Sequence, residues 1–222
     1  MGLEAVIFDL DGTLVDSERL YHKAANIFLR KFNLSVSKEE YIQRWMVNSA
    51  GTEGLLRENN INYPEEKGRW KRRKIYIGLF NAEAELRPGA KRLVQELSKR
   101  VKLAIVSGGL GDDINHLLEK FSIDSYFSTI VSREDTFRSK PDPEPYKMAL
   151  NELVVYPHQA VAIEDSTKGV ISAKRAKMMC VAVPNDYTKK MDFTIAEKVF
   201  TSLQQINYKK LLEVYSNGKN IW

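Results

Sequence analysis

Two aspartates separated by one residue, Asp9 and Asp11, follow an apolar run near the start of the sequence, in the stretch VIFDLDGTLVDS. In a strand, residues two apart point to the same side, so both carboxyl groups can reach one spot at the strand's carboxyl end. Two carboxylates that close repel each other unless a cation lies between them, and Mg²⁺ prefers such oxygen ligands. A turn is the alternative, because Asp11 and Gly12 are typical turn residues. This pair alone leaves both a metal site and a turn open.

Three later apolar runs also end in residues that can do chemistry. Ser107 and Gly108 stand in VSGG, where a hydroxyl and exposed backbone N–H groups can hold an anion. Lys140 lies in SKPDP, whose prolines favour an extended backbone. Glu164 and Asp165 follow a fourth run. Taken singly, these residues also fit a plain loop, a solvated lysine and a helix N-cap at Asp165. Together they favour one shared site, because ligands bind at the carboxyl ends of strands in open α/β sheets.

Short, apolar, β-branched runs predict the strands that must position these residues. They lie at 3–9, 101–107, 128–132, 160–164, 179–183 and, as a weaker edge, 197–201. Helical patterns lie between them at 88–100, 111–120, 143–153 and 167–177. Strands that alternate with helices in this way are typical of a doubly wound parallel sheet covered by helices on both faces. The sequence therefore predicts an α/β fold.

Residues 17–83 interrupt this alternation, since they contain no convincing strand. Their patterns predict helices at about 17–32, 38–46, 50–59 and 64–80. We therefore expect two domains, an α/β core of residues 1–14 and 84–222 and an inserted all-helical cap of residues 15–83.

The composition limits the setting in which the protein works. The 222 residues carry a formal net charge of +5, which favours anionic partners, either nucleic acid or a phosphorylated small molecule. No apolar run is long enough for a transmembrane helix, and the N-terminus lacks the features of a signal peptide. Cys180 is the only cysteine, so no intrachain disulfide is expected. We therefore expect a cytoplasmic setting without membrane attachment, and nothing in the sequence predicts an oligomeric state.

The four polar segments resemble the four motifs of the haloacid dehalogenase-like superfamily of phosphotransferases. They are DLDGTLVDS at 9–17, VSGG at 106–109, SKPDPEPY at 139–146 and IEDSTKGV at 163–170. The resemblance spans the whole chain and favours the branch with a helical C1-type cap inserted after the first motif, which contains phosphoglycolate phosphatase-like and β-phosphoglucomutase-like enzymes. It implies a Rossmann-like core and an enzyme that acts on a small phosphorylated metabolite.

The resemblance also implies a catalytic role for each aspartate of the first motif. Asp9 would be the nucleophile that attacks phosphorus and forms an aspartyl phosphate. Asp11 would protonate the leaving oxygen and then activate the water that hydrolyses the intermediate. Covalent catalysis of this kind divides one difficult displacement into two easier ones. Dehalogenases of the superfamily lack the second aspartate, so Asp11 argues against cleavage of carbon–halogen bonds.

A cofactor and a set of binding residues follow from the same resemblance. The implied cofactor is Mg²⁺, held by Asp9, the main-chain carbonyl of Asp11 and Asp165, with Glu164 nearby. The phosphoryl oxygens would be held by Ser107, the N–H of Gly108 and Lys140. A metal ion and a lysine would offset the repulsion between an attacking carboxylate and an anionic phosphoryl group.

Two departures from the mutase pattern favour a phosphatase. The mutase motif carries a His twelve residues after the nucleophile, where this chain has Tyr21, and His22 comes one residue late. The mutase cap also carries an Arg in the stretch that corresponds to 46–56, which has no basic residue here. We therefore predict Mg²⁺-dependent hydrolysis of a small phosphate monoester. A phosphomutase that acts on a phosphorylated sugar is the first alternative, and a non-catalytic binding protein of the same fold is the remote one.

The segment KGRWKRRK at 67–74 concentrates six cations around Trp70. Such a run is compatible with a patch that binds nucleic acid or phosphate. We favour the solvated face of a cap helix, with Trp70 on its inner side, and expect no nucleic-acid partner.

Lys177 stands where relatives of this pattern usually end a helix with glycine. We expect a left-handed backbone conformation at this position. A residue with a side chain adopts it at a cost of about 1 kcal/mol.

Overall fold

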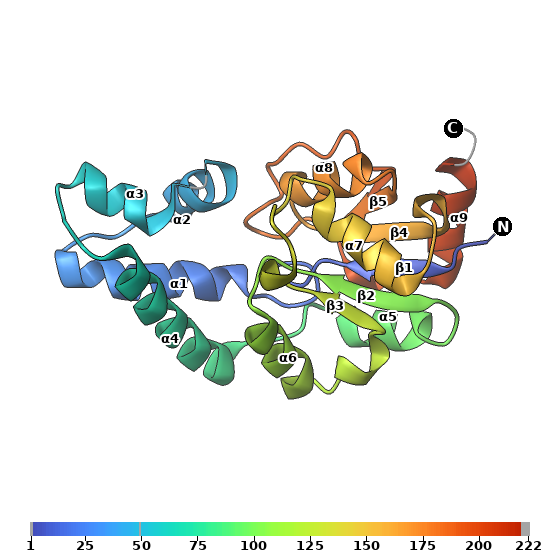
Figure 1. The fold of residues 1–222 in the computed structure, drawn as a ribbon, viewed down its shortest axis with the longest axis horizontal. Helices are drawn as coiled ribbons and strands as arrows, with labels where there is room; N and C mark the ends of the chain where they lie inside the picture. The colour runs from blue at the N-terminus through green and yellow to red at the C-terminus, as the bar shows by residue number, and fades with distance from the viewer. Residues whose placement is uncertain (1, 49, 219–222) are drawn as a thin grey trace. The chain divides into compact units, whose positions relative to one another are not determined.

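Residues 2–48 and 50–218 are described by the structure, a computed structural model of the chain (Figure 1). Met1, Ser49 and residues 219–222, which belong to the expected core and cap, lie outside the described residues. The chain divides into two compact units, which we call the core unit (Met1–Val15 and Leu86–Trp222) and the insertion (Asp16–Glu85). The expected division into two domains at 14/15 and 83/84 stays a prediction, because compactness alone does not establish independent folding.

Six strands form one parallel sheet in the core unit. They are β1 (Ala5–Phe8), β2 (Lys102–Val106), β3 (Thr129–Val131), β4 (Ala160–Glu164), β5 (Met179–Ala182) and β6 (Lys198–Val199). The order across the sheet is β3-β2-β1-β4-β5-β6, which confirms the predicted doubly wound α/β fold. Every residue of β1, β4 and β5 is buried, so these strands are nearly continuous apolar runs rather than alternating ones.

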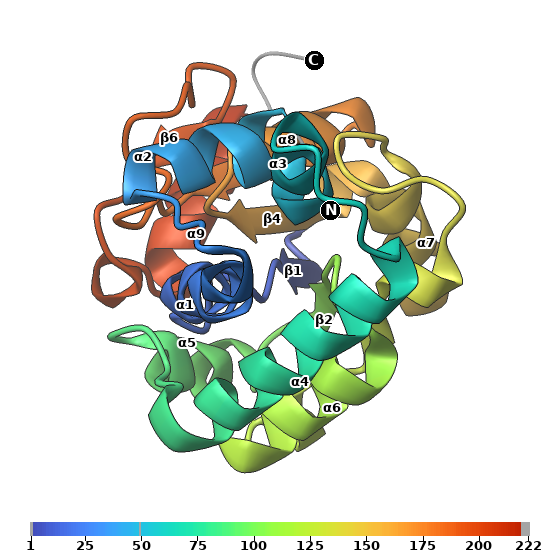
Figure 2. The same cartoon turned by 90° about the vertical axis from the view of Figure 1, so that its left-hand side faces the viewer.

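Helices cover both faces of the sheet (Figures 1 and 2). They are α5 (Ala90–Leu97), α6 (Gly111–Lys120), α7 (Glu144–Leu153), α8 (Thr167–Arg175) and α9 (Tyr208–Gly218). Parallel crossovers are right-handed, so α5 and α6, which connect β1 to β2 and β2 to β3, lie opposite α7 and α8, which lead back to β4 and β5. The sequence did not predict α9. No helix in the described part of the chain is long and apolar enough to cross a membrane.

Short 3₁₀ turns lie between these elements, at Asp124–Tyr126, Arg133–Asp135, Pro157–Gln159 and Leu203–Gln205 in the core unit and Arg30–Phe32 in the insertion. The predicted start of α5 is wrong, since this helix begins at Ala90 rather than at residue 88. Gly89, with a φ of 91°, stands directly before this helix. Since a left-handed residue cannot continue a right-handed helix, α5 starts only after it.

In the middle of the sheet, β1 lies between β2 and β4, where the strand order changes direction. Phe8, the last residue of β1, is level with Ile105 of β2 and Ile163 of β4. The N–H of Asp9 continues the ladder by donating to the carbonyl of Ile163 at 2.9 Å. In sheets of this kind, ligands bind outside the carboxyl ends of the strands at such a switch point. Asp9 therefore stands where a ligand site is expected.

The insertion is helical, as predicted. Its helices are α1 (Glu18–Leu29), α2 (Lys38–Tyr41), α3 (Gly51–Glu58) and α4 (Glu65–Glu83), and a π-helical segment, Ile42–Val47, follows α2. None of its described residues belongs to a β-strand. The rings of Phe28, Phe32 and Tyr63 meet edge to face, with centroids about 5.5 Å apart. The insertion thus has an aromatic core of its own.

Lys177 has the expected left-handed conformation after α8, with a φ of 62°. Its N–H donates to the carbonyl of Lys174, and the N–H of Met178 donates to that of Ala173. These bonds satisfy carbonyls at the end of the helix, which is the usual reason for a left-handed residue there. A lysine at this position carries a steric cost that glycine avoids.

Lys177→Gly should raise the free energy of unfolding by up to about 1 kcal/mol, because glycine adopts this conformation without the steric cost of a Cβ atom. Urea unfolding followed by circular dichroism measures the change. Lys147→Gly, in the interior of α7, is the matched control and should lower the free energy of unfolding by about 1 kcal/mol. Equal losses in both variants would contradict the steric explanation.

Candidate active site

Lys140 lies at the centre of the residues that the sequence predicts to act together. Its Nζ atom donates to Asp9 Oδ1 at 2.6 Å, to Glu164 Oε1 at 2.7 Å and to the carbonyl of Val106 at 2.9 Å. These bonds use all three ammonium protons. Burial alone would lower the pKa of Lys140, but the two carboxylates outweigh burial and raise this pKa above its ordinary value. The lysine is therefore a fixed, largely buried cation, whose side chain is 15% exposed.

Asp9 is buried, and Lys140 compensates the negative charge of its carboxylate only in part. Burial raises the pKa of the Asp9 carboxyl to about 7, an effect that Lys140 opposes and Glu164 reinforces. The Oδ2 atom of Asp9 is buried and has no hydrogen-bond partner. A buried carboxylate oxygen without a partner costs free energy. The position therefore favours a ligand that brings positive charge.

Glu164 ends β4 and is fully buried. Besides the bond from Lys140, its Oε1 atom accepts a hydrogen bond from the hydroxyl of Tyr146 at 2.8 Å, and its Oε2 atom accepts one from Ser166 Oγ at 3.2 Å. Gly169 leaves room for this carboxylate, because a Cβ atom at position 169 would overlap it. Both oxygens of Glu164 thus accept hydrogen bonds, and the side chain holds Lys140 together with Asp9.

Asp165 follows directly and meets a different loop. Its Oδ2 atom accepts a hydrogen bond from Asn185 Nδ2 at 2.6 Å, and its Oδ1 atom lies 3.5 Å from Thr13 Oγ1. The alternative interpretation of Asp165 as a helix N-cap is wrong. The N-cap of α8 is Ser166, whose Oγ atom accepts a hydrogen bond from the N–H of Gly169 at 3.1 Å. The carboxylate of Asp165 therefore does not cap α8.

Asp11 and Ser107 meet across the ends of β1 and β2. The Oγ atom of Ser107 donates to Asp11 Oδ2 at 3.0 Å and accepts from the N–H of Gly109 at 3.0 Å. Gly108 is exposed, and the space where its Cβ atom would lie is open. This turn leaves the backbone at Gly108 accessible to a ligand.

Asp9, Glu164 and Asp165 form an acidic cluster, in which one ligand atom from each lies within 4.8 Å of the others. Carboxylate oxygens are the hard ligands that Mg²⁺ prefers. Lys140 brings one positive charge to two of these acids, and Asp9 Oδ2 has no partner. The residues therefore fit a divalent cation. The side chain of Asp11 is directed to Ser107 instead, which leaves its main-chain carbonyl as the predicted ligand.

The structure brings the residues predicted from the strand ends to one place, while their individual roles stay predictions. Sequence reasoning missed Tyr146 and Asn185, which hold Glu164 and Asp165. Tyr146 lies inside the segment SKPDPEPY, on the buried face of α7. Asn185 lies three residues after β5, so an inspection of the fifth strand end would have found it.

Tyr21 and His22, which stand at and just after the position of the mutase histidine, take part in the packing of the insertion. Tyr21 stacks on Tyr76 with ring centroids 3.9 Å apart. The Nε2 atom of His22 lies 3.0 Å from the carbonyl oxygen of Val36. His22 is thus occupied by contacts with its own unit. Ser49, in the stretch 46–56, lies outside the described residues.

Basic residues of the segment 67–74 on α4 form an ion pair and a cation–π contact within the insertion. Arg72 donates to Glu53 at 2.5 Å, and the Nζ atom of Lys74 lies 5.5 Å from the centre of the Trp70 ring. The predicted inner position of Trp70 is wrong, since this side chain is 59% exposed. Lys74 covers one face of the ring instead, as a cation–π contact.

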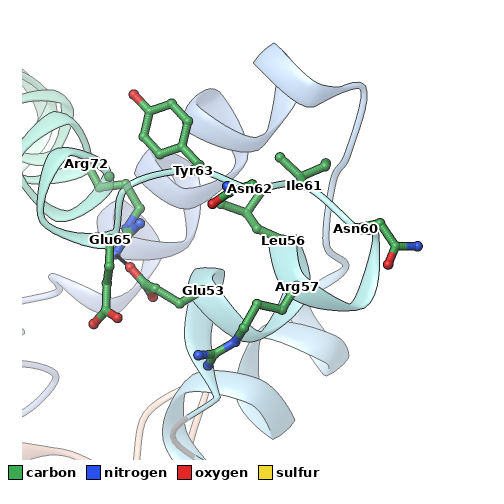
Figure 3. A pocket seen from close by; sticks show the side chains of 10 residues that line it. Glu53, Leu56, Arg57, Asn60, Ile61, Asn62, Tyr63, Glu65 and Arg72 are labelled. Carbon is green, nitrogen blue, oxygen red and sulfur yellow. Dashed lines mark hydrogen bonds and ion pairs between the residues drawn. The ribbon is translucent and has the colours of Figure 1, made fainter.

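Arg72 also lines a hollow of about 400 Å³ within the insertion (Figure 3). Its charged lining residues are Glu53, Arg57, Glu65 and Arg72. Two acids and two arginines balance, so the hollow has no net charge that would favour an anion. Among the described residues, its lining includes none of the predicted site residues.

Comparison with known proteins gives a family match over most of the chain. A family model described as haloacid dehalogenase-like hydrolase matches residues 6–183. Protein CbbY of Cereibacter sphaeroides is 28% identical, over 92% of this chain and 94% of the relative. The phosphorylated carbohydrates phosphatase of Thermotoga maritima is 29% identical, over 78% of this chain and 82% of the relative.

A solved structure shows the same fold over nearly the whole chain. It is that of CbbY from Rhodobacter sphaeroides in complex with phosphate, with a TM-score of 0.84 and 26% identity. The superposition covers 95% of this chain and 99% of that chain.

Asp9→Asn should stabilise the protein against unfolding in the absence of divalent cations. The pKa of Asp9 is about 7 in the folded chain and lower in the unfolded chain, so the folded state binds the proton more tightly. The contribution of this carboxyl to stability is therefore lost as the pH rises from about 4 to about 7. The variant lacks that loss. The difference between its free energy of unfolding and that of the wild type should therefore grow over this range and then stay constant.

Urea unfolding in EDTA at about pH 5 and about pH 8 measures the advantage of Asp9→Asn. Asp186→Asn is the control, because the side chain of Asp186 is 75% exposed. An advantage that does not change between the two pH values would contradict the buried-charge explanation.

Gly169→Ala should lower the free energy of unfolding by about 1–3 kcal/mol, because the new methyl group would displace the carboxylate of Glu164 from its place. Gly111→Ala, in α6 of the same unit, meets its nearest neighbour at 3.5 Å and should be neutral or slightly stabilising. Thermal unfolding of both variants tests the difference. Similar melting temperatures for the two would show that Glu164 moves freely.

Proposed function

The chain belongs to the haloacid dehalogenase-like hydrolase family and is a phosphatase; we propose that it hydrolyses a small phosphate monoester through a covalent intermediate on Asp9, with Mg²⁺ as its cofactor. The observation that carries this proposal is the contact of Lys140 with Asp9 and Glu164 beside the acidic cluster. It gives a carboxylate nucleophile, a fixed cation and a place for a divalent ion at one end of the sheet.

In the first step, a carboxylate oxygen of Asp9 forms a bond to phosphorus while the bond from phosphorus to the ester oxygen breaks. Asp11 donates a proton to the leaving oxygen, so that an alcohol departs. The hydrogen bond from Ser107 to Asp11 Oδ2 supports this role, because it holds the carboxyl group in one orientation. General acid catalysis of such a departure typically contributes a factor of about 10²–10⁴.

In the second step, water attacks the phosphorus of the aspartyl phosphate. Asp11, now ionised, accepts a proton from this water, and the bond between phosphorus and Asp9 breaks. Inorganic phosphate leaves, and both carboxyl groups return to their starting states. One residue therefore serves as acid and then as base, which balances the protons over the cycle.

The charges of the site must be balanced before an anionic substrate can approach Asp9. Asp9, the main-chain carbonyl of Asp11 and Asp165 would hold Mg²⁺, with Glu164 nearby. When bound, the ion would neutralise carboxylates and polarise the phosphoryl oxygens. Lys140 Nζ lies 2.6 Å from Asp9 Oδ1 and would contact an oxygen of the phosphoryl group that Asp9 attacks. Ser107 and the N–H of Gly108 would complete the contacts to the phosphoryl group.

The substrate class that we propose is a phosphorylated carbohydrate or a comparably small phosphorylated metabolite. One relative is a phosphatase of phosphorylated carbohydrates, and the solved CbbY structure contains phosphate. The first supports a phosphorylated carbohydrate as the substrate, and the second supports a site that binds a phosphoryl group.

A screen for phosphate release over sugar phosphates, nucleotides and short-chain phosphorylated acids tests the function. The wild type should release phosphate from one of these classes only with Mg²⁺. Asp9→Asn should lower the rate by roughly 10³-fold or more, because loss of a nucleophile costs factors of this order or larger. Asp186→Asn, at an exposed position, is the control and should keep the wild-type rate.

Two outcomes would contradict the proposal. If a labelled phosphate is moved within a sugar and not released, the protein is a phosphomutase. If no ester reacts with or without Mg²⁺, the fold serves a binding role.

A further inference from the structure

Asn185 contacts the acidic cluster from a loop that none of the four motifs includes. Its Nδ2 atom donates to Asp165 Oδ2 at 2.6 Å and to the carbonyl of Gly12 at 3.1 Å. One amide group therefore joins the loop after β4 to the loop after β1. These are the two loops that carry the predicted metal ligands.

The orientation of the Asn185 amide is fixed by its own loop. Its Oδ1 atom accepts hydrogen bonds from the N–H groups of Tyr187 at 2.7 Å and Thr188 at 3.2 Å. Only the oxygen end of an amide can accept both, so the nitrogen end must face Asp165. The N–H of Asn185 also donates to the buried hydroxyl of Thr188 at 2.9 Å. This closed turn holds the donor in place.

Gly12 shows how tightly the two loops are fitted together. A Cβ atom at this position would overlap the carboxylate of Asp165 and lie 2.7 Å from Asn185 Nδ2. Arg87 donates to the same Gly12 carbonyl at 2.7 Å and to the carbonyls of Val183 at 2.8 Å and Pro184 at 3.0 Å. The loop after β5 is therefore held against the loop after β1 by two side chains.

We propose that Asn185 is a positioning residue for the divalent cation: its amide fixes the carboxylate of Asp165 in the orientation in which that carboxylate binds the metal. The inference rests on the proposed metal site and adds to it the loop after β5. Partners of this kind behind a ligand typically change metal affinity by about 10–100-fold. The amide is uncharged, so it orients Asp165 without neutralising it.

Calorimetric titration of the substrate-free protein with Mg²⁺ tests the proposal. Asn185→Ser should weaken Mg²⁺ binding by about 10–100-fold. A serine hydroxyl can accept the same N–H bonds of the turn but is too short to reach Asp165. The melting temperature without Mg²⁺ should stay close to that of the wild type, because the turn is kept. Asn185→Ala provides a second loss of the donor, with the same expected effect on affinity.

Thr188→Val is the matched control, because it removes the hydroxyl partner of the turn and leaves the amide of Asn185 in place. Its Mg²⁺ affinity should change less than that of Asn185→Ser. Equal losses in the two variants would show that loop folding, and not the amide, sets the affinity, and would overturn the inference. Wild-type affinity in Asn185→Ser would also overturn it. If the wild type itself binds no Mg²⁺, the proposed metal site fails, which is a separate result.

Discussion

The contact of the Lys140 ammonium group with the carboxylates of Asp9 and Glu164 is the interaction on which the rest of the site depends. Removing three charged groups from water is costly, and attraction repays this cost only when the geometry is good and the remaining protons and lone pairs are satisfied. Tyr146 and Ser166 satisfy Glu164, and the missing side chain of Gly169 makes the approach possible. The hydrogen bond that is still missing is that to Asp9, whose Oδ2 atom has no partner.

The sheet explains why these groups meet at all. Parallel strands place their carboxyl ends at one edge of the sheet. The register of β1 with β2 and β4 sets Phe8 level with Ile105 and Ile163. The residues just past these three positions include Asp9, Ser107 and Glu164, so the polar side chains begin where the buried apolar layer ends. A shift of register would separate the charges that must balance one another.

Much of this arrangement could be predicted from the sequence because it depends on strand ends. The apolar runs mark the strands, and the residue types after them identify Asp9, Lys140 and Asp165. What could not be predicted depends on contacts between distant loops. Asn185 and Arg87 act through backbone carbonyls and one carboxylate, and such bonds leave no periodic pattern. The helix α9 follows the last strand of the sheet, so it carries no residues to a further strand end that would mark its place.

The uncharged character of the Asn185 contact follows from the same electrostatics. Lys140 brings one positive charge to the three carboxylates of Asp9, Glu164 and Asp165, and a second ammonium group at Asp165 would neutralise one more of them. A site with less uncompensated negative charge would be more stable on its own but would attract a divalent cation more weakly. An amide supplies the geometric constraint without the charge, so Asp165 keeps its full attraction for a metal ion. Functional sites commonly cost a protein some stability. Here that cost comes from the excess of acidic over basic side chains at the carboxyl ends of the strands.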